Sequence, residues 1–131
     1  MGQAGLQGSI HMGGCHCGAV RFEVVLRDPV ALVCNCSICS RKGFLHLIVD
    51  PADFTLVQGE EALENYTFGT HTAVHRFCKR CGIHPFYTPR SHPDKVDVNG
   101  HCLDDYAADL IQRKTFDGRN WEESIEDLHS S

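Results

Sequence analysis

Alternation of hydrophobic and polar residues is the clearest pattern along this chain. In the segment AVRFEVVL, residues 19–26, Val20, Phe22 and Val24 fall on one side, and Arg21 and Glu23 on the other. Such alternation is typical of a strand with one buried face. Six further segments are predicted as strands: VALVC (30–34), FLHLIV (44–49), FTLVQ (54–58), ENYTF (64–68), AVHRFC (73–78) and IHPFYT (83–88). Short strands at this spacing, separated by turn residues, predict a mainly β fold whose sheet is layered on itself.

The pattern becomes helical toward the C-terminus. DDYAADLI, residues 104–111, predicts a short helix, and RNWEESIEDL, residues 119–128, predicts a firmer one. Asn120 is placed to cap the second helix, and Glu123 follows three residues later, as in a capping box. The apolar face of this helix would contain Trp121, Ile125 and Leu128. We therefore expect a β domain with a short C-terminal helix.

Length and charge limit the possible functions. The chain has 131 residues, 42% hydrophobic and 22% charged, which suits one globular domain. We expect a loose tail over residues 1–11 and a single domain over residues 12–131. The net charge of −5 argues against nucleic acid or an anionic membrane as partner. The sequence has no apolar run long enough to span a bilayer and no signal-peptide core, so it predicts a cytoplasmic protein, or alternatively a nuclear one. It does not indicate an oligomeric state.

Eight cysteines are an unusual number for such a chain. In a reducing compartment, dense cysteine indicates metal binding or catalysis more often than disulfides. The cysteines form three groups and a single residue: Cys15 and Cys17; Cys34, Cys36 and Cys39; Cys78 and Cys81; and Cys102. We interpret Cys102 as a free thiol, since His101 beside it on an extended chain would point the other way.

The CxxCG unit at Cys78 and Cys81 is the strongest single motif. In a zinc knuckle, the turn between two thiolates points backbone N–H groups at the sulfurs, and the following Gly82 relieves the tight backbone path. The rival interpretation is a thioredoxin-like redox pair, which requires a helix N-terminus within a βαβ unit. No such unit is predicted here, so we favour zinc.

Seven cysteines suit two metal ions. A closed tetrahedral site needs two ligands besides the knuckle, and Cys15 and Cys17 are a natural complement. The remaining triplet CNCSIC would leave one coordination position open, as in catalytic zinc sites. Alternatively, a histidine closes it as a Cys₃His structural site, and the nearest candidates are His46, His71 and His75. Spacing alone supports seven ligands and two metals without assigning each ligand to its site.

The segments GGCHCGAVRFEV, CNCSIC and HRFCKRCGIHPFY, in this order and spacing, resemble the family of glutathione-dependent formaldehyde-activating enzymes and centromere protein V. The resemblance covers residues 12–121. It implies a β-tent fold, with zinc-ribbon-like layered antiparallel sheets, that carries two zinc ions. By motif, it assigns the structural zinc to Cys15, Cys17, Cys78 and Cys81, and the catalytic zinc to Cys34, Cys36 and Cys39.

The activity that this resemblance implies is the joining of glutathione and formaldehyde into S-hydroxymethylglutathione, formally a carbon–sulfur lyase reaction run in reverse. Glutathione and a small aldehyde would be the partners. Arg41 and Lys42, directly after the triplet, could meet the carboxylates of glutathione, or could simply form a solvated turn. The sequence indicates no general base. The alternative function is a non-enzymatic, zinc-stapled binding module: a carrier of glutathione or another thiol, or a protein-interaction domain like centromere protein V.

Overall fold

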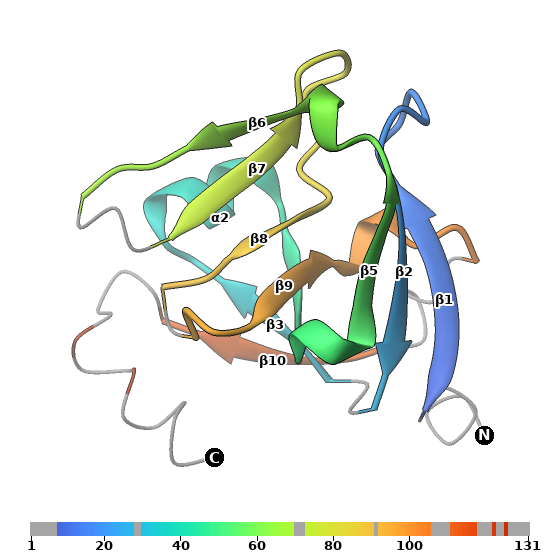
Figure 1. Cartoon of the computed structure of the whole chain (residues 1–131). Helices are drawn as coiled ribbons and strands as arrows, with labels where there is room; N and C mark the ends of the chain where they lie inside the picture. The colour runs from blue at the N-terminus through green and yellow to red at the C-terminus, as the bar shows by residue number, and fades with distance from the viewer. Residues whose placement is uncertain are drawn as a thin grey trace.

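The computed structural model describes residues 8–27, 30–69, 73–90, 92–105 and 111–117, together with positions 122 and 125. The fold is mainly β, as the sequence predicts (Figure 1). The strands are β1 (Ser9–Gly14), β2 (Arg21–Leu26), β3 (Val30–Cys34), β4 (Leu45–Val49), β5 (Phe54–Gln58), β6 (Leu63–Tyr66), β7 (Val74–Cys78), β8 (Phe86–Thr88), β9 (Val96–Asn99) and β10 (Gln112–Phe116). The helical elements are α2 (Ser37–Lys42) and the 3₁₀ turns η1 (Pro51–Asp53), η2 (Glu60–Ala62) and η3 (Gly100–Cys102).

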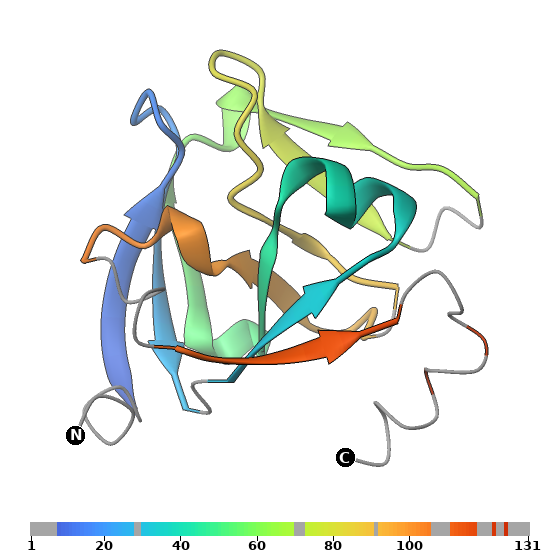
Figure 2. The same ribbon diagram turned by 180° about the vertical axis from the view of Figure 1, so that it is seen from behind.

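The strands form two sheets. The smaller one has the order β1-β2-β5, and the larger one has the order β10-β3-β4-β9-β8-β7-β6. Neighbouring strands are antiparallel in both sheets, except that β10 pairs with β3 in parallel. Seen from behind, β10 runs along β3 at the edge of the larger sheet (Figure 2). This pairing places the end of β3, where Cys34 lies, opposite Phe116.

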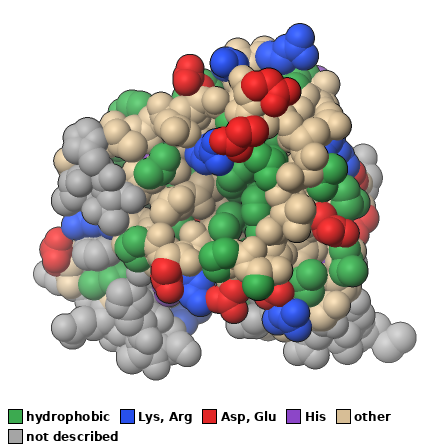
Figure 3. Space-filling model, viewed as in Figure 1, with side chains coloured by type: hydrophobic (Ala, Val, Ile, Leu, Met, Phe, Trp, Pro, Cys, Tyr) green, Lys and Arg blue, Asp and Glu red, His purple; other side chains and the backbone are tan. Residues whose placement is uncertain are grey.

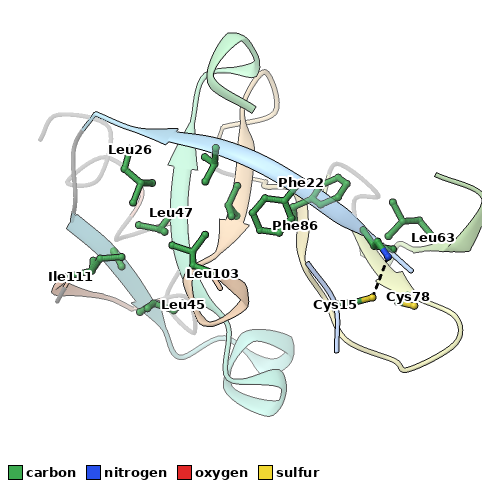
Figure 4. Close-up of a cluster of buried hydrophobic side chains, with 14 of the residues drawn as sticks. Cys15, Phe22, Leu26, Leu45, Leu47, Leu63, Cys78, Phe86, Leu103 and Ile111 are labelled. Atoms are coloured by element: carbon green, nitrogen blue, oxygen red, sulfur yellow. Dashed lines mark hydrogen bonds between the residues drawn. The ribbon is translucent and has the colours of Figure 1, made fainter. Parts of the chain in front are cut away.

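The core lies between the two sheets. Along β2, Phe22, Val24 and Leu26 are buried and alternate with half-buried positions, which confirms the predicted one-sided strand. The Phe22 ring stacks on Phe54 at 5.6 Å between ring centroids. It also meets Phe86 edge-on at 6.5 Å, so it links the smaller sheet to β8 (Figure 4). Full burial of one such side chain contributes roughly 1.5 to 3 kcal/mol to folding.

The sequence does not predict three of the strands, namely β1, β9 and β10. β1 begins at Ser9, so the sheet starts within the segment 1–11 that was predicted as a tail. Its glycines serve close packing, because a Cβ atom on Gly13 would lie 2.5 Å from the Phe22 ring. β9 alternates apolar and polar residues over only four positions, VDVN, and β10 carries mostly exposed polar side chains, so the pattern predicts neither strand.

The helical predictions meet the structure only in part. The segment SICSRK, which contains Cys39 of the triplet, forms α2, a helix that the sequence does not predict. Of the helix predicted over residues 104–111, Asp104 and Asp105 lie in a turn, Ile111 is not helical, and the rest falls outside the described residues. Of the helix predicted over residues 119–128, only positions 122 and 125 are described; both are helical, and Ile125 is buried. The strand predicted from residue 83 begins at Phe86, directly after Pro85, which lacks the N–H that a ladder needs.

The surface is mixed in charge. Lysine and arginine side chains lie among aspartate and glutamate side chains over the described part of the face seen in Figure 3. Among the described residues, no helix has both the length and the apolar composition needed to cross a bilayer.

Candidate metal centres and the adjoining pocket

Four cysteines from distant parts of the chain meet between the two sheets. Cys15 and Cys17 lie on the turn between β1 and β2, while Cys78 and Cys81 flank the turn after β7, and the four sulfur atoms all lie within 4.8 Å of one another. Cys17 Sγ is 3.6 Å from Cys15 Sγ and 3.7 Å from Cys78 Sγ. A tetrahedral ion with metal–sulfur bonds of about 2.3 Å spaces its sulfurs about 3.8 Å apart. The cluster therefore has the dimensions of a four-thiolate metal site.

The local backbone supports thiolates at this cluster. Val20 N–H donates to Cys15 Sγ at 3.3 Å, and Cys15 and Cys78 both belong to the buried core (Figure 4). At Cys81 burial raises the pKa, but N–H groups of Cys17 and Ile83 donate to the sulfur and the net effect lowers its pKa to about 6. Gly82, at φ 79°, continues the chain in the left-handed region that favours glycine. These features are those of the predicted knuckle.

The cysteine triplet is built on the junction between a strand and a helix. Cys34 ends β3, Cys36 caps α2, and Cys39 lies in the first turn of α2, so that the three sulfur atoms lie within 4.8 Å of one another. Cys39 N–H donates to Cys36 Sγ at 3.4 Å. Hydrogen bonds from the Cys34 and Cys39 thiols lower the pKa of Cys36, while the hydrogen bonds of Cys39 with Cys34 and Cys36 raise the pKa of Cys39. Three adjacent thiols cannot all ionise without a cation among them, so this donor set also suits a metal ion.

The structure does not group the histidines suggested as a fourth ligand with the triplet, or does not describe them. His46 Nδ1 is 2.6 Å from Asp97 Oδ2, and His75 Nδ1 is 3.0 Å from Lys42 Nζ. His71 falls outside the described residues. Within the part of the chain that the structure describes, the triplet groups three sulfurs and no histidine. The Cys₃His alternative therefore gains no support from His46 or His75.

A pocket of about 380 Å³ adjoins the triplet. One side comes from the loop and helix that carry the triplet, and the other from the strand β6 and the segments near it. Its lining residues are Ser37, Ile38, Arg41, Lys42, Tyr66, Phe68 and His84. The Tyr66 and Phe68 rings stack at 5.7 Å between centroids and are both exposed. The pocket thus combines a basic side with an aromatic side.

The two basic residues of this pocket have different surroundings. Arg41 is exposed, and its Nη1 donates to the carbonyl oxygen of Ser37 at 2.7 Å. Lys42 Nζ lies 4.7 Å from the centre of the Phe44 ring and 4.6 Å from that of Tyr87. Loss of hydration lowers the pKa of Lys42, although the negative charges of Cys39 and Asp97 oppose this shift. Lys42 is thus a partly buried cation held over two aromatic rings.

His75 accepts the hydrogen bond from Lys42. Burial, and then the positive charge of Lys42, lower the pKa of His75 to about 4, so its imidazole is neutral at pH 7. With Nδ1 accepting from the Lys42 ammonium at 3.0 Å, the ring proton lies on Nε2. The His75 ring also stacks on Tyr87 at 4.6 Å between centroids. These contacts fix the direction of the Lys42 side chain.

A buried histidine–aspartate pair was not foreseen from the sequence. His46 is 4% exposed and Asp97 is 1% exposed, and the Tyr87 hydroxyl lies 3.3 Å from His46 Nδ1. Burial first, and then the charge of Asp97, raise the pKa of Tyr87 well above its ordinary value. Within the described residues, His46 Nε2 and Asp97 Oδ1 find no hydrogen-bond partner. The one sequence signal was a charged residue between two valines in VDV, since such a strand position is otherwise apolar.

Cys102 is a half-buried thiol, in agreement with its interpretation as a residue outside both clusters. Burial raises its pKa to about 12, and the charges of Cys15 and Cys81 act in the same direction. Its Sγ lies 3.9 Å from the carbonyl oxygen of His84. A thiol that resists ionisation in this way is a poor nucleophile.

The comparisons with known proteins agree with these features. Residues 10–119 match the sequence profile of the family described as "Glutathione-dependent formaldehyde-activating enzyme". A Halomonas elongata protein named "Putative glutathione-dependent formaldehyde-activating enzyme" is 37% identical over 78 residues, which are 53% of this chain and 50% of that protein. The chain thus spans about half the length of this curated relative. The crystal structure of a Rhodobacter sphaeroides protein superimposes with a TM-score of 0.71 and 39% identity, over 79% of this chain and 99% of that one.

Proposed function

Because the chain belongs to the family of glutathione-dependent formaldehyde-activating enzymes, we propose that it joins glutathione and formaldehyde into S-hydroxymethylglutathione, a carbon–sulfur lyase reaction run in reverse. The observation that carries this proposal is the position of the cysteine triplet. Its three sulfurs converge within 4.8 Å, and the intervening residues Ser37 and Ile38 line a pocket of about 380 Å³. A ligand in this pocket would therefore lie beside the triplet.

The proposed metal is zinc, at two ions per chain. Cys15, Cys17, Cys78 and Cys81 would hold a structural ion, because four thiolates complete a tetrahedral zinc shell. Cys34, Cys36 and Cys39 would hold the catalytic ion, because three ligands leave a position for a substrate sulfur. When bound there, zinc lowers the pKa of a coordinated thiol and so supplies the nucleophile at neutral pH.

The side chains of the pocket have distinct proposed tasks. Arg41 is exposed at the rim of the pocket, where its planar guanidinium can bind a carboxylate of glutathione with two hydrogen bonds. Tyr66 and Phe68 form the opposite wall and would cover the tripeptide on its apolar side. Lys42 is a second candidate for a glutathione carboxylate, but its ammonium lies deeper, beside His75. Together these residues would hold the thiol of glutathione next to the triplet and exclude water from it.

The test must separate catalysis from binding, since formaldehyde and thiols combine without help. The rate of exchange between ¹³C-formaldehyde and S-hydroxymethylglutathione, measured by NMR exchange spectroscopy, should rise with protein concentration and saturate with glutathione. Cys36→Ser, which removes one ligand of the proposed catalytic zinc, should return the rate to its uncatalysed value. A zinc-loaded wild-type protein that binds millimolar glutathione in calorimetry without accelerating exchange would instead be a thiol carrier.

A cytoplasmic or nuclear location is part of the same proposal. All eight cysteines are free thiols, and clusters of this kind persist where thiols are kept reduced. Glutathione as a substrate is consistent with such a compartment.

A further inference from the structure

The proposed reaction moves a proton as well as forming a bond. Glutathione enters with a proton on sulfur, and the product carries a proton on the former aldehyde oxygen. A thiolate held at the proposed zinc would be the nucleophile, but a separate group must take up and deliver this proton. The sequence indicated no such group, and none of the seven clustered cysteines is free to act as one if they hold metal.

Lys42 is the side chain whose position suits this task. It lines the pocket beside the triplet, three residues after Cys39, and its ammonium is withdrawn from solvent over the Phe44 and Tyr87 rings. The hydrogen bond to His75 Nδ1 at 3.0 Å uses one of its three N–H donors. The negative charges of Cys39 and Cys36 act on the same ammonium and favour its charged form.

We propose that Lys42 is a catalytic residue that carries the proton from the thiol of glutathione to the aldehyde oxygen. This inference rests on the proposed function. The Lys42 ammonium donates a proton to the aldehyde oxygen as the glutathione sulfur bonds to the formaldehyde carbon and the C=O π electrons move to oxygen. The Lys42 amine left behind then takes up the proton that the thiol sulfur loses, which restores the ammonium. The sum is one thiol and one aldehyde giving one hydroxymethyl thioether, with the Lys42 ammonium regenerated.

The neighbouring groups are less suited to the same role. Arg41 keeps its proton at any physiological pH, so it cannot act as a base. His84 also lines the pocket, but its Nδ1 is enclosed, and burial lowers its pKa to about 4, which makes it a weak base. His75 is already fixed as the acceptor for Lys42. His46, Asp97 and Tyr87 lie buried behind Lys42, where the Asp97 charge helps to hold the ammonium form.

Lys42→Met provides the test, since a thioether chain of similar length retains the packing between the two rings. We expect kcat for exchange to fall at least 100-fold, within the range for loss of a general acid–base. The dissociation constant for glutathione, by calorimetry, should change less than threefold, and the zinc content should not change. Lys95→Met is the matched control, because Lys95 lies in a surface ion pair with Asp50 and should keep wild-type activity.

Two further variants keep the test decisive if Lys42→Met folds poorly. Lys42→Arg keeps the positive charge, but a guanidinium does not give up a proton at physiological pH, so the variant should bind glutathione and still lose at least 30-fold in kcat. Lys42→Ala should regain activity when trimethylamine is added, a tertiary amine that does not condense with formaldehyde, and a packing role would not produce this rescue.

Wild-type activity in Lys42→Met or Lys42→Arg would overturn the role of Lys42 and leave the proposed function standing. The role also falls if the loss appears only as weaker glutathione binding. A zinc-loaded wild-type protein without any acceleration would overturn both proposals.

Discussion

The Sγ atoms of Cys17 and Cys78 lie 3.7 Å apart, although 61 positions separate the two residues in sequence. A metal ion at this cluster would therefore close a long loop and join the smaller sheet to the end of β7. The triplet closes no comparable loop, because Cys34 and Cys39 are separated by only a few residues. The two centres should therefore differ in their contribution to folding.

Cys81→Ser should leave the protein largely insoluble or unfolded. A structural zinc contributes on the order of 10 kcal/mol of apparent folding free energy, which is comparable to the whole stability of a domain. Cys36→Ser, as the matched variant at the other cluster, should fold, retain one zinc ion and lose activity. Thermal unfolding and zinc counts on both purified variants check this. Unfolding of Cys36→Ser with a folded Cys81→Ser would reverse the assignment of the two centres.

Protein purified without chelators and then supplied with zinc should contain two ions per chain, because the described residues hold two separate thiol clusters. Elemental analysis gives the count, and thiol titration under native conditions gives the number of reactive cysteines. We expect Cys102 to react more slowly than an exposed thiol, since burial raises its pKa to about 12. A reproducible count of one zinc, with the triplet thiols reactive, would contradict the second site.

Asp97→Ala should destabilise the fold by about 3 kcal/mol, since removing one partner of a buried pair leaves the other without compensation. Asp97 is 1% exposed and accepts from His46 at 2.6 Å. Asp94→Ala on the exposed preceding turn serves as the control and should change the free energy of unfolding by less than about 0.5 kcal/mol. Urea denaturation of the zinc-loaded proteins measures both values. Equal stability of the two variants would mean that the His46–Asp97 pair contributes nothing net.

The stability of the wild-type protein should fall on acidification, in part through His75. Its pKa is about 4 in the folded protein, below the value near 6.5 of an unfolded chain. Between these values the unfolded state binds the proton first, so the free energy of unfolding decreases as the pH falls from 6.5 toward 4. His75→Gln keeps an acceptor for Lys42 but does not titrate. The melting temperature of this variant should therefore drop less than that of the wild type between pH 7 and pH 5. Acid also affects the metal sites, but it does so equally in both proteins. Parallel pH profiles would exclude His75 as the source.

The sequence predicts the parts of the fold that are stabilised by side chains. β2 follows from alternation, and β3 and β5 have the bounds predicted for them, 30–34 and 54–58. The two thiol clusters follow from cysteine spacing, because neighbouring thiolates must share a cation. β10 could not be found in this way. Its segment QRKTF is exposed except for the half-buried Phe116, and its pairing with β3 is made by the backbone.

The candidate site shows the same division. Arg41 and Lys42 are adjacent cations after the triplet and look equivalent in sequence, yet one is exposed and the other lies over two aromatic rings. The turn of α2 produces this difference, because successive helical residues point about 100° apart. The partners of Lys42, namely Phe44, His75 and Tyr87, come from three separate segments that only tertiary packing brings together.

The parallel pairing of β10 with β3 has a consequence for biosynthesis. During translation, β3 and Cys34 at its end emerge from the ribosome long before residues 112–116 have been translated. Until then, β3 is an open edge whose unpaired N–H and C=O groups can recruit another chain. Nascent chains stalled before residue 112 should therefore be prone to aggregation and slow to acquire metal at the triplet, whereas the four-cysteine cluster is fully translated once Cys81 has emerged. Maturation of the two centres would thus be ordered in time by the direction of translation.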